Sequence, residues 1–204
     1  MKKIAIYGAS GHGKVVADIA EICGYKVEFF VDDDDSKKEF CGMPVYGFEF
    51  AKTHRDICFG LGIGKNSARE KVFELLISNE FRLPFLIHPS AVISKSVIIG
   101  KGTVIMPNVV VNAYASIGMG VILNSSSIIE HDVNIGEFAH ISPGSAIAGG
   151  VEIGVGVHLG INSTVIQGLK IGRHSVIGAG SVVIRDIEAN SLVVGAPAKE
   201  IKKI

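Results

Sequence analysis

Three consecutive polar residues, Glu130, His131 and Asp132, place an imidazole between two carboxylates. Histidine exchanges a proton near neutral pH, and a nearby carboxylate can orient the ring and favour its charged form. The arrangement indicates a general base, the alternative being a histidine that is merely exposed at a turn. Asn124 and His140 lie within nine residues of His131. We therefore expect one neighbourhood to bring these polar side chains together.

His140 and His158 stand eighteen residues apart, and each directly precedes an aliphatic residue. We expect both to point outward and to stack on one face of the fold. The histidines have no metal-ligand spacing, so we predict no metal site. No serine or cysteine near His131 has an evident activating partner, which favours direct attack over an acyl-enzyme.

A second group of residues follows predicted strands near the amino terminus. The loop Gly8–Gly13 reads G-x-x-G-x-G, whereas the dinucleotide fingerprint reads G-x-G-x-x-G. Its glycines would let the backbone approach a phosphate at a helix N-terminus. Asp32, Asp33 and Gly64 end two further strands, and the carboxyl ends of parallel strands meet at one edge. The pattern predicts a nucleotide site there, the alternative being an empty α/β cap.

Strands and helices alternate through the first 88 residues. We predict strands over 3–7, 26–31, 56–61 and 83–87, helices over 14–23 and 67–79, and a turn with a short helix over 44–52. This order is typical of a Rossmann-like parallel sheet. His88-Pro89-Ser90 marks the predicted end of this domain, which spans 1–88.

A six-residue repeat occupies the next hundred residues. Isoleucine, leucine or valine stands at every sixth position from Ile93 to Val183, and small or β-branched residues stand two positions earlier, from Ala91 to Ser181. The period fits neither an α-helix nor a flat strand and predicts an all-β parallel β-helix over 89–190. We expect the tail, 191–204, to run back along its outside.

A longer period of eighteen residues is carried by glycine: Gly100, Gly118, Gly136, Gly154 and Gly172. Three hexads then form one coil, with three short strands and three corners. We attribute the glycines to a corner that turns with unusual backbone dihedrals.

Composition excludes several classes of protein. Twenty basic and twenty acidic residues balance, which argues against a nucleic-acid binder. The uncharged stretch between Lys101 and Glu130 contains proline, asparagine and glycine, so we interpret it as solenoid wall, with no membrane insertion. An uncharged wall predicts contact with other copies, hence a homotrimer. The start of the chain does not resemble a signal peptide, and the three cysteines lack metal-type spacing, which suggests a cytoplasmic protein.

Several motifs together resemble one family. They are Ile6-Tyr-Gly-Ala-Ser-Gly-His-Gly13, Phe30-Val-Asp-Asp33, Ile63-Gly64, Ile87-His-Pro-Ser90, Asn124-Ser-Ser-Ser-Ile-Ile-Glu-His-Asp132, Ile135-Gly-Glu-Phe-Ala-His140, Leu159-Gly-Ile-Asn162 and Gly195-Ala-Pro-Ala198. The whole chain resembles the sugar O-acyltransferases related to sialic acid O-acetyltransferases. Within them it is most similar to bacterial UDP-4-amino-sugar N-acetyltransferases of the bacillosamine pathway.

The resemblance implies a left-handed β-helix, a homotrimer, and acetyl-CoA in the groove between neighbouring β-helices. It implies that His131 is the general base, assisted by Asp132, with Glu130 as a rival. His140, Ile161 and Ala179 would contact acetyl-CoA. The residues that would contact the nucleotide sugar are Ser10, Gly11, His12, Asp32, Asp33, Gly64 and Asn124.

The expected function is acetyl transfer from acetyl-CoA to the amine of a nucleotide-linked amino sugar, of the UDP-4-amino-4,6-dideoxy-N-acetyl-hexosamine type. Sugar O-acetylation is one alternative, and a non-catalytic nucleotide-sugar-binding scaffold is another. The residues leave open whether the nucleotide is UDP, GDP or CMP.

Overall fold

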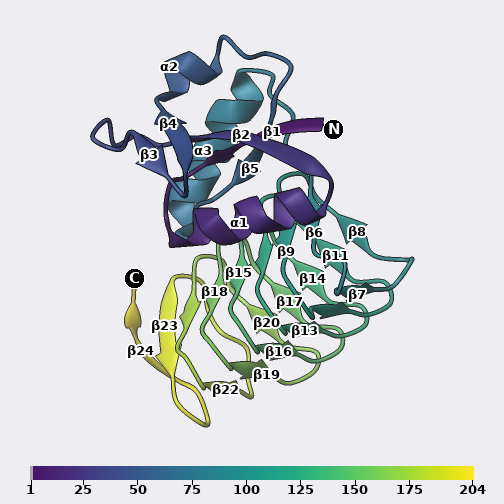
Figure 1. Ribbon diagram of the computed structural model, residues 1–204. Coiled ribbons are helices and arrows are strands. Elements are labelled where there is room, and N and C mark those ends of the chain that lie inside the picture. The colour runs from purple at the N-terminus through teal and green to yellow at the C-terminus, as the bar shows by residue number, and fades with distance from the viewer. Residues whose placement is uncertain (1) are drawn as a thin grey trace.

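The structure is a computed structural model and describes residues 2–204. An α/β layer lies against one side of a column of short strands (Figure 1). The layer contains strands β1 (Lys2–Tyr7), β2 (Tyr25–Val31), β3 (Glu39–Phe40), β4 (Met43–Tyr46) and β5 (Cys58–Leu61), and helices α1 (Gly11–Ile22), α2 (Phe48–Ala51) and α3 (Asn66–Ser78). The sheet order is β3-β4-β2-β1-β5, parallel except for the β3–β4 pair.

The central strands of this sheet are buried on both faces. Ile4, Ala5 and Ile6 are fully buried, as expected for a parallel strand covered on both sides. On one face α1 contributes Val16 and Ile19, and on the other α3 contributes Leu76. The predicted Rossmann-like α/β arrangement is therefore confirmed.

The predicted strand over 83–87 differs from the structure. Only β6 (Leu86–Ile87) is a strand, and it pairs in parallel with Val104 and Ile105 rather than with the α/β sheet. One isolated bridge, Cys58 to Arg82, still touches β5. The chain leaves the α/β layer just before β6, because Leu86 continues the register of the column.

Seventeen two-residue strands, β6 to β22, form the three walls of this column. The first wall contains β7 (Val92–Ile93), β10 (Val110–Val111), β13 (Ile128–Ile129), β16 (Ala146–Ile147), β19 (Thr164–Val165) and β22 (Val182–Val183). The second contains β8 (Ile98–Ile99), β11 (Ser116–Ile117), β14 (Asn134–Ile135), β17 (Glu152–Ile153) and β20 (Lys170–Ile171). The third contains β6, β9 (Val104–Ile105), β12 (Ile122–Leu123), β15 (His140–Ile141), β18 (His158–Leu159) and β21 (Val176–Ile177).

Pairing in these walls follows the eighteen-residue period. Ile117 pairs with Ile135, and His140 pairs with His158, each eighteen positions on. The sixth-position aliphatics form one core from Ile105 to Val183, each at most 3 % exposed. The parallel β-helix predicted from the hexads is thus confirmed, with successive coils stacked like the rungs of a ladder.

The reason predicted for the glycine period is wrong. Gly100, Gly118, Gly136, Gly154 and Gly172 are absent from the residues with positive φ. A Cβ atom on Gly136 would lie 2.7 Å from the backbone nitrogen of Val155 in the next coil, and the others meet backbone equally closely. Glycine is needed at this corner because the coils touch there. The left-handed turns come two residues later, as at Gly102, Phe138 and His174.

The α/β layer covers part of the uncharged wall. Val104, Met106 and Ile122 point outward from the third wall and pack in one core with Val16 and Ile19 of α1, which lies across these strands in Figure 1. This part of the wall is therefore buried within the chain itself. Four exposed apolar residues lie on the other two walls and at their shared corner: Val92, Ile98, Tyr114 and Ile128.

The tail does more than run back along the outside. β23 (Ser191–Val194) pairs in parallel with β21 and places Val193 in the β-helix core. β24 (Lys199–Lys203) then turns back antiparallel to β23 with exposed side chains. None of the helices described in residues 2–204 has the length and apolar character needed to cross a membrane.

Candidate active site

The sheet-edge pocket lies at the carboxyl ends of β1, β2 and β5. This cavity of about 350 Å³ is lined by Tyr7, Gly8, Ser10, Asp32, Asp33, Ile63, Gly64 and Lys65. The structure thus brings together Ser10, both aspartates and Gly64, four of the residues expected to contact a nucleotide sugar. Parallel strands produce this convergence because their carboxyl ends share one edge.

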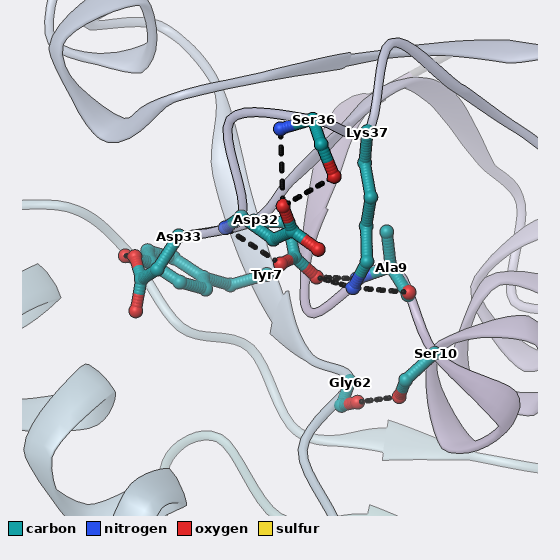
Figure 2. A network of polar contacts seen from close by, with 9 residues as sticks. Tyr7, Ala9, Ser10, Asp32, Asp33, Ser36, Lys37 and Gly62 are labelled. Carbon is teal, nitrogen blue, oxygen red and sulfur yellow. Dashed lines mark hydrogen bonds and ion pairs between the residues drawn. The ribbon is translucent and has the colours of Figure 1, made fainter.

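Asp32 organises the loops around this pocket (Figure 2). Its Oδ2 accepts hydrogen bonds from the backbone N–H of Ala9 (2.9 Å) and from Lys37 Nζ (2.9 Å), and its Oδ1 accepts one from the N–H of Asp34 (3.0 Å). Burial raises the pKa of the Asp32 carboxyl, but these hydrogen bonds outweigh it and leave the pKa below its ordinary value. Asp32 therefore holds the β1–α1 loop against the β2 loop as an ionised carboxylate.

Asp33 turns the other way and contacts Tyr7 (Figure 2). The Tyr7 hydroxyl donates a 2.6 Å hydrogen bond to Asp33 Oδ1. Burial and the Asp33 carboxylate raise the pKa of Tyr7, so the phenol stays protonated and keeps donating. Asp33 also lines the sheet-edge pocket, and its Oδ2, which makes no side-chain contact in this network, is an acceptor suited to a hydroxyl or N–H group.

The histidine pocket adjoins the sheet-edge pocket. It has a volume of about 660 Å³ and is lined by Gly64, Lys65, Asn66, Ser67, His140, Gly156, His158, His174, Val176 and Ile204. Gly64 and Lys65 line both pockets. A ligand on the sheet edge and a second ligand on the third wall of the β-helix can therefore approach each other across this one loop.

Asn124 holds His140 in a defined orientation. Its Oδ1 accepts the N–H of Ser125, so its Nδ2 is the donor to His140 Nε2 at 3.1 Å. Burial, followed by the charges of His158 and Arg69, lowers the pKa of His140 to about 3, and a hydrogen bond with the Gly64 backbone opposes this only in part. His140 is consequently neutral at pH 7 and serves as a hydrogen-bonding group, not as a cation.

His12 faces the same region from the start of α1. Its ring centroid lies 6.4 Å from that of His140, and its buried Nε2 has no hydrogen-bond partner. Burial and Arg69 lower the pKa of His12 to about 4. An unpartnered buried nitrogen is a site that a ligand could satisfy. Gly11 lies exposed beside it at the start of α1 and, unlike Ser10, does not line the sheet-edge pocket.

His131 and Asp132 form a pair at an exposed corner. His131 Nδ1 lies 2.8 Å from Asp132 Oδ2, and both side chains are more than 60 % exposed. The contact uses Nδ1, and His131 Nε2 has no hydrogen bond to any of the residues 2–204. Glu130, the predicted rival, has no hydrogen bond or ion pair to the ring in the described part of the chain. The geometry favours Asp132 as the orienting carboxylate.

Within one chain His131 and His140 do not share a neighbourhood, so that expectation is wrong. His131 follows β13 and leads into β14, at the corner between the first and second walls. His140 begins β15, on the third wall, which lies opposite that corner in a three-walled prism. Asn124 accompanies His140 instead. The six-residue period treats all three walls alike, but the eighteen-residue period places residues nine apart on opposite sides of a coil, a signal that the expectation left unused.

Ile161 and Ala179 lie at the corner between the third and first walls. They are exposed and occupy equivalent positions one coil apart. The backbone oxygen of Ile161 accepts the N–H of Gly180 (2.8 Å), which fixes the rung between them. This corner is an exposed edge of the third wall, which carries His140 and His158. The roles of both residues in CoA binding stay predictions.

Arg69 is a buried residue that the sequence analysis missed. It is 1 % exposed, and its guanidinium donates to the carbonyl oxygens of Gly120 (2.7 Å) and Phe138 (2.7 Å) in the β-helix and of Gly64 (3.0 Å) in the shared loop. Burial lowers its pKa to about 10, so it remains charged at pH 7. Arg69 joins the loop to the coil that carries His140. No pattern in the sequence predicts its burial, because arginine on a helix is usually exposed.

A further cavity of about 410 Å³ lies at the opposite edge of the α/β sheet, among residues such as Lys2, Cys58, Arg82 and Lys101. It shares no lining residue with either pocket described above. Among residues 2–204, His, Cys, Asp and Glu side chains form no group of three or more that could hold a metal ion.

The fold defines a class of protein: an α/β domain joined to a hexapeptide β-helix. Residues 3–76 match the family described as PglD N-terminal domain. The structure of PerB from Caulobacter crescentus, in complex with CoA and GDP-perosamine, is 37 % identical, covers 98 % of this chain and 97 % of its own, and superposes with a TM-score of 0.93. The chain belongs to the family of hexapeptide-repeat sugar acetyltransferases that contains such nucleotide-amino-sugar N-acetyltransferases.

Two more relatives support this assignment. The acetyltransferase domain of PglB from Neisseria gonorrhoeae FA1090, in complex with acetyl coenzyme A, is 35 % identical over 98 % of this chain and 99 % of its own, with a TM-score of 0.90. UDP-N-acetylbacillosamine N-acetyltransferase from Bacillus subtilis (strain 168) is 37 % identical over 112 residues, which are 52 % of each chain. The match therefore spans about half the length of that curated relative.

Proposed function

We propose that this protein transfers an acetyl group from acetyl-CoA to the amine of a nucleotide-linked amino sugar. The observation that carries the proposal is the shared wall of the two pockets, formed by Gly64 and Lys65. One pocket offers a glycine-rich loop and aspartates to a nucleotide, and the other offers neutral histidines to a thioester. Relatives that bind CoA with GDP-perosamine, or acetyl coenzyme A, have the same fold.

Direct transfer in a ternary complex accounts for the residues present. The sugar amine attacks the thioester carbonyl carbon, the C–N bond forms, and the C–S bond breaks to release CoA. His131 Nε2 accepts the proton that the amine loses, while Asp132 holds Nδ1. No covalent enzyme intermediate is needed, since bringing both reactants together supplies much of the rate. His140, neutral and fixed by Asn124, lines the pocket proposed for the thioester end of acetyl-CoA.

The separation of His131 from His140 requires a second copy of the chain. The exposed corner with His131 would enter the groove beside the histidine pocket of a neighbouring copy, and cyclic repetition of that contact closes a trimer. Four exposed apolar residues flank this same corner: Val92, Ile98, Tyr114 and Ile128. Burying them between copies would stabilise the assembly. In this arrangement each site takes its base from one copy and its two pockets from the next.

Complementation between two inactive variants tests the shared site. We expect His131→Ala and His140→Ala to be inactive separately and to regain about one quarter of wild-type activity after co-expression, because random trimers then contain some intact sites. Light scattering on the wild-type protein should give the trimer mass. A monomer at micromolar concentration, or no recovery in mixed trimers, would place the base elsewhere.

A substrate panel tests the reaction itself. Acetyl-CoA consumption is measured with UDP-, GDP- and CMP-linked 4-amino sugars, and the product is identified by mass spectrometry and NMR as an amide or an ester. We expect amide formation with a nucleotide-linked 4-amino-6-deoxy sugar. We propose UDP as the nucleotide, and faster turnover with GDP would correct that choice. An ester product would indicate O-acetylation, and binding of nucleotide sugar without any turnover would indicate a scaffold.

A further inference from the structure

The imidazole of His131 lies directly over the backbone of Gly149. An ideal Cβ atom placed on Gly149 would be 2.6 Å from His131 Cε1, 2.7 Å from Nε2 and 3.2 Å from Nδ1. Real Cβ contacts essentially never fall below 3.0 Å. The ring therefore occupies the volume that any side chain at position 149 would fill.

Stacking of the coils explains this contact. Position 149 follows His131 by eighteen residues and lies one coil further along the same corner, where the N–H of Gly150 donates to the carbonyl oxygen of His131 (3.0 Å). Adjacent strands are spaced ~4.8 Å apart, so an imidazole that leans along the column reaches the next coil. The corresponding residues one coil before His131 and one coil after Gly149 are Ala113 and Gln167.

Gly149 is not explained by backbone conformation. Its φ lies outside the left-handed region, in contrast to its neighbour Gly150 (φ 68°). It also differs from Gly136, where the obstacle to a side chain is the backbone of the next coil. At Gly149 the obstacle is the end of one side chain that is 63 % exposed and free to swing outward. A methyl group there would disturb the position of the base far more than the fold.

We propose that Gly149 is a positioning residue, whose missing side chain lets His131 lie against the next coil with Nε2 held towards the acceptor amine. This inference rests on the proposed role of His131 as general base. Two contacts together fix the ring. Asp132 restrains Nδ1, and the backbone of Gly149 limits tilting of the ring towards the next coil. With alanine at 149 the ring must move away, so its distance to the amine changes.

A double-mutant cycle tests the proposal. We measure kcat and KM for wild type, Gly149→Ala, His131→Ala and the double variant. Gly149→Ala should lower kcat by about 10- to 100-fold with KM for both ligands nearly unchanged, since a displaced base typically forfeits much of a 10²–10⁴-fold contribution. The double variant should be no slower than His131→Ala, because residue 149 acts through His131. If Gly149→Ala lowers kcat by the same factor in the His131→Ala background as in wild type, or if Gly149→Ala is fully active, the proposal is overturned.

Two control substitutions separate position from stability. Gly47→Ala has open space, with only Asp35 Oδ1 at 3.9 Å, and should leave both kcat and the melting temperature unchanged. Gly136→Ala should lower the melting temperature, whereas Gly149→Ala should not. NMR of the His131 ring supplies a readout independent of turnover. Its chemical shifts should change in Gly149→Ala, and unchanged shifts would contradict the contact between the ring and Gly149. If wild type itself transfers no acetyl group, the proposed function fails, while the NMR comparison still tests the contact.

Discussion

The imidazole rings of His140 and His158 stack face to face, with centroids 4.9 Å apart and planes inclined by only 6°. They occupy equivalent positions on adjacent coils, and each has a partner for Nε2: Asn124 for His140 and Ser142 for His158. Burial lowers the pKa of both rings, and their mutual repulsion adds to this for His140. The stack is stable because neither ring is charged.

Acid should therefore destabilise the protein through these histidines. His140 has a pKa of about 3 in the folded chain and about 6.5 when unfolded, so the unfolded state binds more protons between these values. The contribution of neutral His140 to the free energy of unfolding is complete above pH 6.5 and is lost as the pH falls towards 3. Between pH 7 and pH 5 the loss is about 2 kcal/mol for this group. Urea denaturation at several pH values should show that the free energy of unfolding depends less on pH in His140→Gln than in wild type. Equal slopes for the two proteins would contradict the low pKa of His140.

Arg69 should be the most sensitive position for stability. Arg69→Met leaves the buried carbonyl oxygens of Gly120 and Phe138 without their donors, which should cost about 3 kcal/mol or more. Arg69→Lys keeps the charge but cannot fork between these oxygens, so an intermediate loss is expected. The unfolding midpoints in urea measure both. A wild-type midpoint for Arg69→Met would show that the two parts of the chain do not depend on this contact.

His131→Ala should abolish most turnover without unfolding the protein. The side chain is exposed at a corner, so its removal leaves no cavity. Loss of a general base typically lowers kcat by ~10²–10⁴-fold. The variant should keep its melting temperature and its affinity for acetyl-CoA, as measured by calorimetry. Asp132→Ala should lose less, because it removes the orienting carboxylate but keeps the imidazole. Near-normal kcat in His131→Ala would make another group the base.

Asp32→Ala should selectively weaken binding of the nucleotide sugar. It removes the acceptor for the N–H groups of Ala9 and Asp34 and for Lys37, so the loops around the sheet-edge pocket lose their anchor. We expect binding to weaken by about tenfold or more, equivalent to about 1.4 kcal/mol, with CoA affinity nearly unchanged. Calorimetry with each ligand measures this, and Asp35→Ala, an exposed acid outside the pocket, is the control. Equal weakening of both ligands would mean that the acceptor site is misplaced.

Gly64 illustrates why such selectivity depends on tertiary structure. From sequence it belongs only to the nucleotide edge, since it follows a predicted strand there. In the structure it also lines the histidine pocket, accepts a hydrogen bond from Arg69 and contacts His140 through its backbone. A substitution at Gly64 should therefore affect both ligands, whereas Asp32 lines only the sheet-edge pocket.

Local periodicity was sufficient to predict the β-helix and the α/β sheet. Hexads specify which residues point inward, because each short strand alternates between core and surface irrespective of what lies outside. The same reasoning placed Asp32, Asp33 and Gly64 at one edge, since parallel strands share a direction. These properties depend on neighbours a few residues away or on a fixed repeat, so the sequence alone determines them.

Only the tertiary structure decided which of these features meet. The repeat of six does not by itself distinguish three walls, but the eighteen-residue period does, and His131 and His140, nine residues apart, lie half a coil from each other. Their separation was therefore present in the sequence and was overlooked. The hexads cannot show that α1 covers Val104 and Ile122, or that Arg69 is buried, because both depend on how the α/β layer docks onto one wall. They also assigned the corner glycines to dihedral strain, where the true cause is contact between coils. Such contacts join residues far apart in the chain, and packing in three dimensions selects them.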